Sequence, residues 1–395
     1  MPKVLLGVSG GVSAYKSVSL ARLLKEAGAD LTIVPTPSAL NFVGKATWEA
    51  ISGKPVYAEV FEATDRVAHV ALAREADLVV VAPATADLIY RAAAGAGNDM
   101  LSSILLTHTK RVIFFPAMHS EMWLNPATQA NVSVLRERGH LVVNPATGAL
   151  ARGDEGIGRL PEPEQIVRLI KSYLEKTNLI NDFQNIKALV TLGGTSEKID
   201  PVRSITNRST GEMGAAICRA LYLRGADVTA IAANHSAVLP HDVNIISVNT
   251  VAELAKQTKQ EVANADLIVM AAAVSDFTAT AQEGKISRTG KVSLELQATE
   301  DILAGLGESK NPNQFLVGFA AQSSDVIAAG KAKLLRKKCD LIVANEIGEE
   351  LGFGDRKTEI HLISETGVVS TGEVSKDAAA HAILDEIARK WQLQH

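Results

Sequence analysis

Residues 3–11, which read Lys-Val-Leu-Leu-Gly-Val-Ser-Gly-Gly, decide the fold class of the first half of the chain. A short apolar strand enters a glycine-containing turn there, and an amphipathic helix follows that ends near Gly28. Near-continuous apolar strands that alternate with helices are typical of a parallel sheet covered on both faces. Further strands of this kind are expected at residues 30–36, 78–82, 112–116 and 141–144.

The same pattern restarts in the second half of the chain. Residues 188–192 predict a strand, Gly193-Gly194-Thr195 its loop, and residues 214–223 the helix that follows. That helix leads into a second strand at residues 227–232. Later buried strands are expected at residues 267–272, 316–319 and 341–344.

Two polar stretches interrupt these patterns. Residues 175–187 are rich in Asn and follow a helix, so they are the best candidate for a linker. Residues 275–291 contain Gly284 and Gly290 and are expected to form a loop beyond the carboxyl end of a strand, where open parallel sheets bind ligands. We therefore predict an α/β protein with two Rossmann-like doubly wound domains: residues 1–175, a linker at 176–187, and residues 188–395.

Composition excludes several classes of function. The net charge of -4 gives no global reason to bind nucleic acid or an anionic membrane, and aromatic residues make up only 4% of the chain. We see neither a signal peptide nor an apolar stretch long enough to span a bilayer, so we expect a cytoplasmic protein. Cys218 and Cys339 offer no disulfide framework and no metal-ligand spacing, and we interpret them as inert core residues.

The first loop, Ser9-Gly10-Gly11, suits an anion. Glycines let the backbone approach a phosphate, and the amides at the start of the following helix point toward it. The loop does not read GxGxxG, and the second strand runs into Pro35-Thr36-Pro37-Ser38 without an acidic residue. Because NAD binding favours a carboxylate at that point, the loop favours a mononucleotide over NAD. Taken alone, the two glycines are equally consistent with a steric role.

Two longer motifs decide between these alternatives. Residues 82–88 read Ala-Pro-Ala-Thr-Ala-Asp-Leu, and residues 116–123 read Pro-Ala-Met-His-Ser-Glu-Met-Trp. With the first loop and His69, they resemble the flavoprotein family of cysteine decarboxylases, which acts on phosphopantothenoylcysteine among other substrates, over roughly residues 3–165. The resemblance implies that FMN oxidises the substrate thiol to a thioaldehyde, that carbon dioxide then leaves, and that the flavin reduces the resulting enethiolate.

The resemblance also implies site residues for this half. His69 matches the active-site histidine, a base or an orienting group; the alternative is a helix-start histidine without a chemical role. Positions that match the surroundings of FMN and its phosphate are Ser9, Gly10, Ser38, Thr85 and Ser102.

Two residues depart from the family pattern. His119 stands where the family usually has Asn, and Arg152 stands where its flap carries the Cys thought to protonate the enethiolate carbon. An arginine does not readily donate a proton at neutral pH, and His119 is the nearest replacement acid by motif. The alternative is a non-catalytic first half that serves as a flavin-binding scaffold or regulatory subunit beside an active second half.

The second half carries an ordered set of motifs. These are Gly193-Gly194-Thr195, residues 200–203 (Asp-Pro-Val-Arg), Asn207, residues 209–214 (Ser-Thr-Gly-Glu-Met-Gly) and residues 271–277 (Ala-Ala-Ala-Val-Ser-Asp-Phe). The set resembles the phosphopantothenate–cysteine ligase family across roughly residues 188–390. The resemblance implies that CTP, with Mg²⁺, activates the carboxylate of 4'-phosphopantothenate as an acyl-cytidylate with release of pyrophosphate, and that the amine of cysteine then attacks to give phosphopantothenoylcysteine.

Carried over residue by residue, Asn207 governs capture of the acyl-cytidylate, Arg203 contacts the substrate, and Lys285 closes over the phosphates. The residues expected around CTP are Met270, Ala271, Ala272, Asp276, Lys285, Glu300, Asp301, Ile302, Leu303, Phe319, Lys333 and Lys337. Lys333 and Lys337 stand at i and i+4, and the alternative for them is a solvated basic helix face. No residue of either half is identifiable as a metal ligand from sequence.

Residues 299–301, Thr-Glu-Asp, replace a usual Asn-Pro-Asp of the ligase family. Both families further imply a homo-oligomer, with trimers of the flavoprotein half and dimers of the ligase half. The expected partners are therefore small molecules and further copies of the chain, and neither a nucleic acid nor a membrane.

Overall fold

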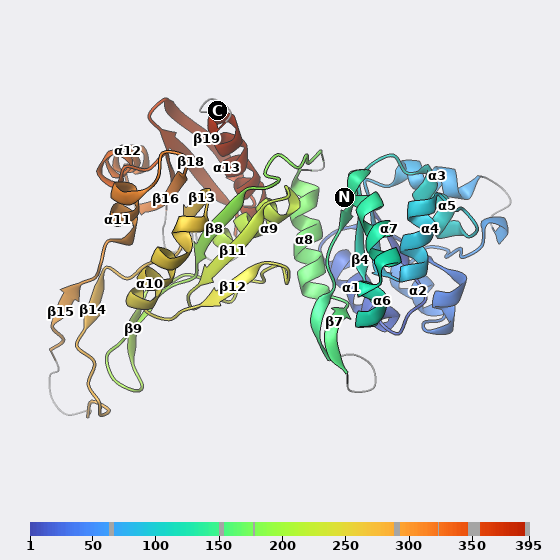
Figure 1. Cartoon of the computed structure of the whole chain (residues 1–395), viewed down its shortest axis with the longest axis horizontal. Coiled ribbons are helices and arrows are strands. Elements are labelled where there is room, and N and C mark those ends of the chain that lie inside the picture. Colours follow the sequence, from blue (N-terminus) through green and yellow to red (C-terminus); the bar gives the residue numbers. More distant parts are fainter. Residues whose placement is uncertain are drawn as a thin grey trace. The chain divides into compact units, whose positions relative to one another are not determined.

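The structure is a computed structural model that describes residues 1–62, 67–149, 154–176, 178–287, 293–322, 324–346 and 356–391. The chain divides into two compact units, Met1–Leu174 and Glu175–His395 (Figure 1). Each unit is built on its own central sheet, so the two are described separately.

The sheet of unit 1 is parallel throughout, in the order β2-β1-β3-β4-β5. Its strands are β1 (Lys3–Val8), β2 (Asp30–Pro35), β3 (Leu78–Ala84), β4 (Val112–Pro116) and β5 (Leu141–Val142). The predicted strands are all present, although the last is two residues long. Apart from Lys3, β1 is buried along its whole length, as are β3 and β4, which explains their continuous apolar sequences.

Helices cover both faces of this sheet. One core joins β3 and β4 to helices on the side of α3, α4, α5 and α7, and α1 packs on the other side against β1, β2 and β3. The helices are α1 (Ala14–Glu26), α2 (Lys45–Ser52), α3 (Ala68–Glu75), α4 (Ala86–Ala94), α5 (Met100–Thr107), α6 (Ser120–Leu124), α7 (Pro126–Glu137) and α8 (Pro163–Glu175), with short 3₁₀ helices at Pro37–Asn41 (η1) and Val60–Glu62 (η2).

A separate antiparallel hairpin follows the sheet of unit 1. It consists of β6 (Ala146–Ala149) and β7 (Glu155–Arg159). The amide of Met118 donates to the carbonyl of Gly158 at 2.9 Å, which fastens the hairpin to the loop after β4. A Cβ atom at Gly158 would lie 2.0 Å from the Met118 oxygen, so only glycine permits this approach.

The sheet of unit 2 has eight strands in the order β12-β11-β8-β13-β16-β17-β18-β19. They are β8 (Lys187–Leu192), β11 (Asp227–Ala232), β12 (Asn244–Ser247), β13 (Leu267–Met270), β16 (Phe315–Gln322), β17 (Leu341–Glu346), β18 (Thr358–Ser364) and β19 (Gly367–Val374). The pairs from β12 to β17 are parallel, as predicted, whereas β17, β18 and β19 pair antiparallel. The sheet is therefore mixed, a difference from the doubly wound parallel sheet that the sequence predicts.

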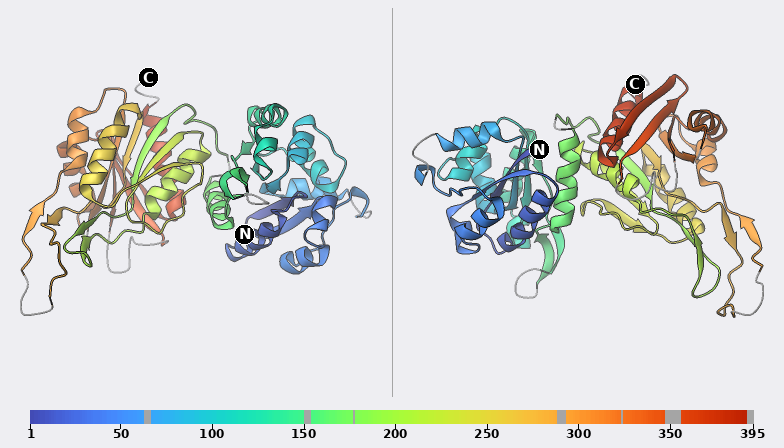
Figure 2. Two further views of the ribbon diagram at one scale, coloured as in Figure 1. Left: turned by 60° about the horizontal axis from the view of Figure 1, so that its bottom comes forward. Right: turned by 180° about the vertical axis from the view of Figure 1, so that it is seen from behind.

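Two apolar cores lie on opposite faces of this sheet. One packs α9 and α13 against the strands, and the other packs α10, α11 and α12 (Figure 2). The helices are α9 (Glu212–Leu223), α10 (Val251–Glu261), α11 (Ile302–Ser309), α12 (Val326–Lys337) and α13 (Lys376–Trp391), with a 3₁₀ helix at Val262–Asn264 (η4). Both cysteines are buried in these cores, and burial raises the pKa of Cys218 and of Cys339 to about 12, consistent with inert thiols.

Two small antiparallel ribbons project from this unit, as Figures 1 and 2 show. One pairs β9 (Ser196–Lys198) with β10 (Ser204–Thr206), and the other pairs β14 (Phe277–Ala279) with β15 (Leu296–Ala298). The prediction of a loop over residues 275–291 is wrong for its first part, because β14 lies there. Three-residue strands escape detection because they are too short to show an alternating pattern.

The segment before β8 packs within unit 2. Phe183 is 2% exposed, and its amide donates to the carbonyl of Arg224 at 3.1 Å. The guanidinium of Arg224 lies over the Phe183 ring at 4.8 Å and pairs with Asp182. The Nη1 atom of Arg224 also donates to the carboxylate of Asp385 at 2.9 Å. This part of the segment expected as a linker is thus held by a buried cation.

Candidate functional sites

The predicted flavin loop lies where the carboxyl ends of β1 and β2 meet. Gly10 faces Ser38 so closely that a Cβ atom at Gly10 would lie 2.3 Å from the Ser38 hydroxyl oxygen. Ser38 is exposed on η1, and its hydroxyl lies 3.1 Å from that of Thr36, which caps this helix. Gly10 and Ser38 are therefore close neighbours, as residues of a common site would have to be.

Ser9 holds the first loop against the loop after β3. Its hydroxyl donates to the carbonyl of Pro83 and accepts from the amide of Thr85, both at 2.8 Å. Ser9 is 1% exposed, so both hydrogen bonds are buried. Thr85 is half-buried and caps α4 by accepting from the amide of Leu88. The hydrogen bonds of Ser9 therefore fix the conformation of the predicted flavin loop, and Thr85 lies at the edge of that loop.

Ser102 has a structural role in the described chain. It is 1% exposed at the start of α5, where its amide and its hydroxyl each lie 2.7 Å from the carboxylate of Asp99. This is a reciprocal capping box, which satisfies amides that the helix leaves unpaired. The side chain of Arg91 forms an ion pair of 2.6 Å with the same carboxylate of Asp99.

The N-terminus of α1 has donors to offer. Ser13 occupies the cap position of this thirteen-residue helix, and its side chain makes no capping hydrogen bond. Val12 and Ser13 separate the two glycines of the predicted flavin loop from the helix, and the amides of Ala14 and Lys16 already donate to the carbonyls of Gly11 and Ser13. A phosphate is a suitable acceptor for the other amides at such a helix start. The residues present therefore fit the phosphate of a mononucleotide.

His69 is the second residue of α3 and is half-buried. Within the described residues its ring has no hydrogen-bond or ion-pair partner. The far end of α3 is fixed by His108, whose Nδ1 atom lies 2.8 Å from the carbonyl oxygen of Ala73. Since a carbonyl only accepts, Nδ1 carries the proton there. His69 is thus an unengaged imidazole on an anchored helix.

His119 precedes α6 and faces two carboxylates. Its Nδ1 atom lies 3.1 Å from Glu121 and its Nε2 atom 3.9 Å from Asp154, which comes directly before β7 of the hairpin. The pKa of Glu121 is lowered because its carboxylate accepts a hydrogen bond from its own backbone amide and another from His119. Arg152, the residue that replaces the family cysteine, lies outside the described residues.

In unit 2, glycines let the start of α9 approach β8. A Cβ atom at Gly214 would lie 2.5 Å from the Cβ atom of Leu192, and one at Gly193 would lie 2.7 Å from the Ala233 carbonyl. Gly193 and Gly211 also have φ values of 84° and 76°, in the left-handed region that glycine adopts readily. The motifs around residues 193–195 and 209–214 therefore form one loop cluster at the carboxyl end of β8.

Two threonines of this cluster hold the loop after β13. The Thr191 hydroxyl accepts from the amide of Ala272 at 3.2 Å, and the Thr195 hydroxyl accepts from that of Ser275 at 2.9 Å. Both threonines are fully buried. They fix the backbone at residues 270–275, which includes the predicted nucleotide contacts Met270 and Ala271. Met270 is itself buried, so its backbone and not its side chain is available there.

Asn207 is attached to the same loop. Its side-chain amide donates to the carbonyl of Val274 at 2.9 Å, although the residue is exposed. Arg203, also exposed, donates to Asp200 at 2.7 Å. Lys285 is exposed, and no hydrogen bond or ion pair of its side chain is found in the described part of the chain. These three predicted residues therefore lie at the solvent side of the loop cluster.

A second group gathers around the start of α11. The Lys337 ammonium pairs with Asp301, which caps this helix, and Lys333 donates to the carbonyl of Phe319 at 2.6 Å. Burial is the largest cause that lowers the pKa of Lys333, and the charge of Asp276 acts in the opposite direction. Since Lys337 is only 8% exposed, a solvated basic face does not describe it.

The remaining predicted nucleotide residues differ in their surroundings. Ile302 is buried and Leu303 half-buried in the core beneath α11. Glu300 is exposed and pairs with Lys259 of α10 at 2.6 Å. That ion pair was not expected from sequence, where a carboxylate replaces the usual proline without any sign of its partner.

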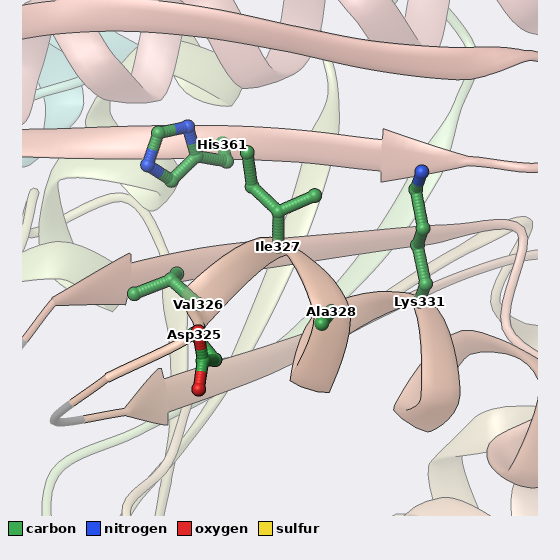
Figure 3. Close-up of a pocket in the computed structure, with 6 residues that line it drawn as sticks. All are labelled: Asp325, Val326, Ile327, Ala328, Lys331 and His361. Carbon is green, nitrogen blue, oxygen red and sulfur yellow. The ribbon is translucent and has the colours of Figure 1, made fainter.

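A separate groove of about 540 Å³ lies beside the start of α12 (Figure 3). It contains none of the predicted site residues, and the Nδ1 atom of His361 already lies 2.7 Å from the Ser370 hydroxyl. Its lining residues are Asp325, Val326, Ile327, Ala328, Lys331 and His361.

The described residues bear on metal binding and on membrane insertion. Among them, no three His, Cys, Asp or Glu side chains are grouped so as to hold a metal ion. No helix in the described part has both the length and the apolar character needed to cross a membrane.

Comparisons with known proteins cover the whole chain. The family model described as Flavoprotein matches residues 1–175, and that described as DNA/pantothenate metabolism flavoprotein C-terminal domain matches residues 183–390. The Coenzyme A biosynthesis bifunctional protein CoaBC of Mycolicibacterium smegmatis is 44% identical, with 98% of this chain and 97% of the relative covered. The protein of the same name from Vibrio vulnificus is 38% identical, with 98% and 97% covered.

Solved structures match each half. The C-terminal domain of a Coenzyme A biosynthesis bifunctional protein CoaBC aligns with a TM-score of 0.47 and 30% identity, covering 54% of this chain and 98% of that one. The FMN binding protein AtHal3 aligns with a TM-score of 0.41 and 32% identity, covering 44% of this chain and 97% of that one.

Proposed function

The chain belongs to the family of coenzyme A biosynthesis bifunctional proteins, and on this premise we propose how its two halves divide two consecutive reactions. Residues 188–395 join 4'-phosphopantothenate to cysteine, and residues 1–175 decarboxylate the phosphopantothenoylcysteine that results. The full-length match to relatives of this name, with both family models in the same order, is the observation that carries the proposal.

In the ligase half, CTP is the activating nucleotide and enters with Mg²⁺ on its phosphates. The described residues contain no grouped metal ligands, which is consistent with an ion that arrives with the triphosphate. The carboxylate oxygen of phosphopantothenate attacks the α-phosphorus of CTP, pyrophosphate leaves, and an acyl-cytidylate forms. The cysteine nitrogen then attacks the acyl carbon, cytidine monophosphate leaves, and the nitrogen loses a proton.

The residues of unit 2 support these roles by their chemistry. Lys285 offers a free ammonium to the phosphates, Arg203 a guanidinium to the acid substrate, and Asn207 an amide next to the nucleotide loop. The base and ribose lie between the backbone at residues 270–272 and the start of α11, near Asp276 and Phe319. Lys333 and Lys337 form the cationic wall of this pocket, while Glu300 stays on its outer side with Lys259.

In the flavoprotein half, the start of α1 together with Gly10, Ser38 and Thr85 would hold the phosphate of FMN. When bound, FMN supplies oxidation of the substrate thiol and the later return of the hydride. His69 orients the substrate or takes its proton. His119 gives a proton to the enethiolate carbon after carbon dioxide leaves, in place of the thiol that Arg152 replaces.

The experiment is an assay of the full chain with CTP, Mg²⁺, cysteine and 4'-phosphopantothenate. We expect a yellow protein that forms 4'-phosphopantetheine, with CTP preferred over other nucleotides. Accumulation of phosphopantothenoylcysteine by a yellow protein would instead favour the second candidate, a non-catalytic flavin-binding first half. The observation that favours this candidate is Arg152, which stands where the family has a cysteine. A colourless protein that does not turn over CTP would contradict the proposal.

The remaining parts of the proposal concern assembly and location. We propose a homo-oligomer with trimeric contacts of the flavoprotein half and dimeric contacts of the ligase half, acting in the cytoplasm. Mass measurement of the intact particle tests the first point, because a monomer would contradict it.

A further inference from the structure

Asp200 stands at the turn between β9 and β10, and its carboxylate is almost fully engaged. We infer that Asp200 is a positioning residue of the ligase half, which holds Arg203 and the loop of Lys285 in one arrangement. The inference rests on the ligase function proposed above. It concerns a residue that touches neither substrate in our proposal and acts through two residues that do.

The two carboxylate oxygens of Asp200 accept four hydrogen bonds. Oδ1 accepts from the amides of Val202 and Arg203, each at 2.7 Å. Oδ2 accepts from the Arg203 guanidinium at 2.7 Å and from the amide of Ile286 at 3.2 Å. Asp200 is 3% exposed, so this group is shielded from water. One buried side chain thus joins a local turn to a loop more than eighty residues away.

The loop is fastened on both sides of Lys285. The Arg203 guanidinium also donates to the carbonyl of Ile286 at 3.2 Å. The amide and the carbonyl of Ile286 are therefore both hydrogen-bonded. On the other side, the amide of Gln282 donates to the carbonyl of Ile199 at 2.9 Å. Lys285 lies between these attachments, with its own side chain exposed.

The charge of Asp200 explains why a carboxylate is needed. Burial alone would raise its pKa, but the amides of Val202, Ile286 and Arg203 together with the Arg203 charge lower it below its usual value. All four partners are donors. An asparagine would turn one acceptor oxygen into a donor. Either the amides of Val202 and Arg203, or the Arg203 guanidinium and the amide of Ile286, would then face a repulsive group.

This arrangement leaves both cations available for ligands. Only one terminal nitrogen of Arg203 is used by Asp200 and Ile286, and its side chain remains 45% exposed. The rest of the guanidinium can receive a carboxylate or phosphate. Holding two ligand-binding cations in place before the ligand arrives lowers the cost of ordering them during binding.

The test compares Asp200→Asn with Asp385→Asn in the full chain. Asp385 also pairs with an arginine of unit 2, Arg224, but far from this loop. We expect Asp200→Asn to reduce ligase kcat/KM by about 10- to 100-fold, the scale on which small misplacement lowers rates, and Asp385→Asn to leave it within about twofold. Decarboxylation of supplied phosphopantothenoylcysteine remains unchanged in both variants.

A second readout does not depend on activity. Trypsin should cut the bond after Lys285 faster in Asp200→Asn than in the parent chain, because a released loop enters the protease more readily. Mass spectrometry of the fragments identifies that bond. Equal cleavage rates together with an unchanged ligase would overturn the inference.

A mutant cycle separates the inference from the function on which it rests. If Asp200 acts through Arg203 and the loop, adding Asp200→Asn to Arg203→Lys, a variant that keeps a charged side chain, should lower the ligase rate less than Asp200→Asn lowers it in the parent chain. Additive losses would mean an independent, structural role. An unaffected Lys285→Gln would instead contradict the proposed nucleotide site. Should Asp200→Asn fail to fold, Asp200→Glu, whose longer side chain displaces the carboxylate while keeping its charge, must reproduce the loss.

Discussion

The Oδ2 atom of Asp154 lies 3.9 Å from the Nε2 atom of His119, so the β6–β7 hairpin meets the loop after β4 through an acid and a base. The second nitrogen of the same ring faces Glu121 at 3.1 Å. A histidine whose two ring nitrogens face carboxylates is a candidate for proton transfer. In our proposal, this imidazole supplies the proton that the family thiol would give.

We predict that His119→Asn lowers decarboxylation by about 100-fold or more, because general acids contribute on this scale. The yellow colour should persist, since His119 has no part in the proposed phosphate site. The measurement is carbon dioxide release from supplied phosphopantothenoylcysteine. Adding Arg152→Cys to this variant should restore part of the rate by supplying a thiol. Full activity of His119→Asn on its own would show that another group donates the proton.

We predict that Lys285→Gln abolishes amide formation while bound flavin and decarboxylation of supplied intermediate stay intact. The reason is that, among the residues that the structure describes, its ammonium has no hydrogen-bond or ion-pair partner, and we propose that it neutralises the phosphates of CTP. The measurement is pyrophosphate release. Lys331→Gln is the matched control, since Lys331 is another exposed lysine of unit 2 but lines the separate groove beside α12. Normal turnover in Lys285→Gln would refute the placement.

Sequence patterns predicted the central strands of both units closely. Val112–Pro116 and Asp227–Ala232 match their expected bounds residue for residue, because buried parallel strands give continuous apolar runs. The edge of the second sheet was not predicted. β19 is exposed along much of its length and reads Gly-Val-Val-Ser-Thr-Gly-Glu-Val, with two glycines and no regular alternation of polar and apolar residues, so its sequence resembles that of a loop. A pattern search without knowledge of β18 has no reason to pair it.

Some contacts among the predicted site residues follow from the fold pattern, and others do not. Gly10 and Ser38 come together because both follow the carboxyl ends of strands, whereas Lys333 of α12 reaches the carbonyl of Phe319 within β16. By contrast, the role of Asp200 depends on Ile286, which is far away in sequence. No spacing rule signals such a contact, although Asp200 belongs to a motif that sequence reasoning singled out.

We predict that unit 1 loses stability as the pH falls below about 6.5, the ordinary histidine pKa. Burial is the largest cause that lowers the pKa of both His108 and His140, helped by Lys110 for the first and by Arg138 for the second. The unfolded chain therefore binds protons that the folded unit does not, so stability rises with pH through this window and falls on acidification. The measurement is the urea midpoint against pH.

The control for this pH dependence is His108→Gln with His140→Gln. The slope between pH 5 and about 7 should become smaller in this double variant, because neither buried imidazole remains to be protonated. His140 also accepts from the amide of Val112 at 3.2 Å, a bond that protonation would break. An unaltered slope would assign the acid sensitivity to other groups.

Finally, we predict that Gly214→Ala destabilises unit 2 by about 1–3 kcal/mol, the usual cost of overpacking a tight core. Its Cβ atom would lie 2.5 Å from that of Leu192 and 3.3 Å from the carbonyl of Thr191, and neither atom is a mobile side-chain end. The displaced start of α9 should also lower ligase turnover. Gly305→Ala in α11 is the matched control, because nothing lies within 4 Å of its Cβ position and alanine favours a helix by up to about 1 kcal/mol. Urea denaturation measures the stability of both variants. Equal midpoints would mean that the contact between α9 and β8 accommodates an extra methyl group without strain.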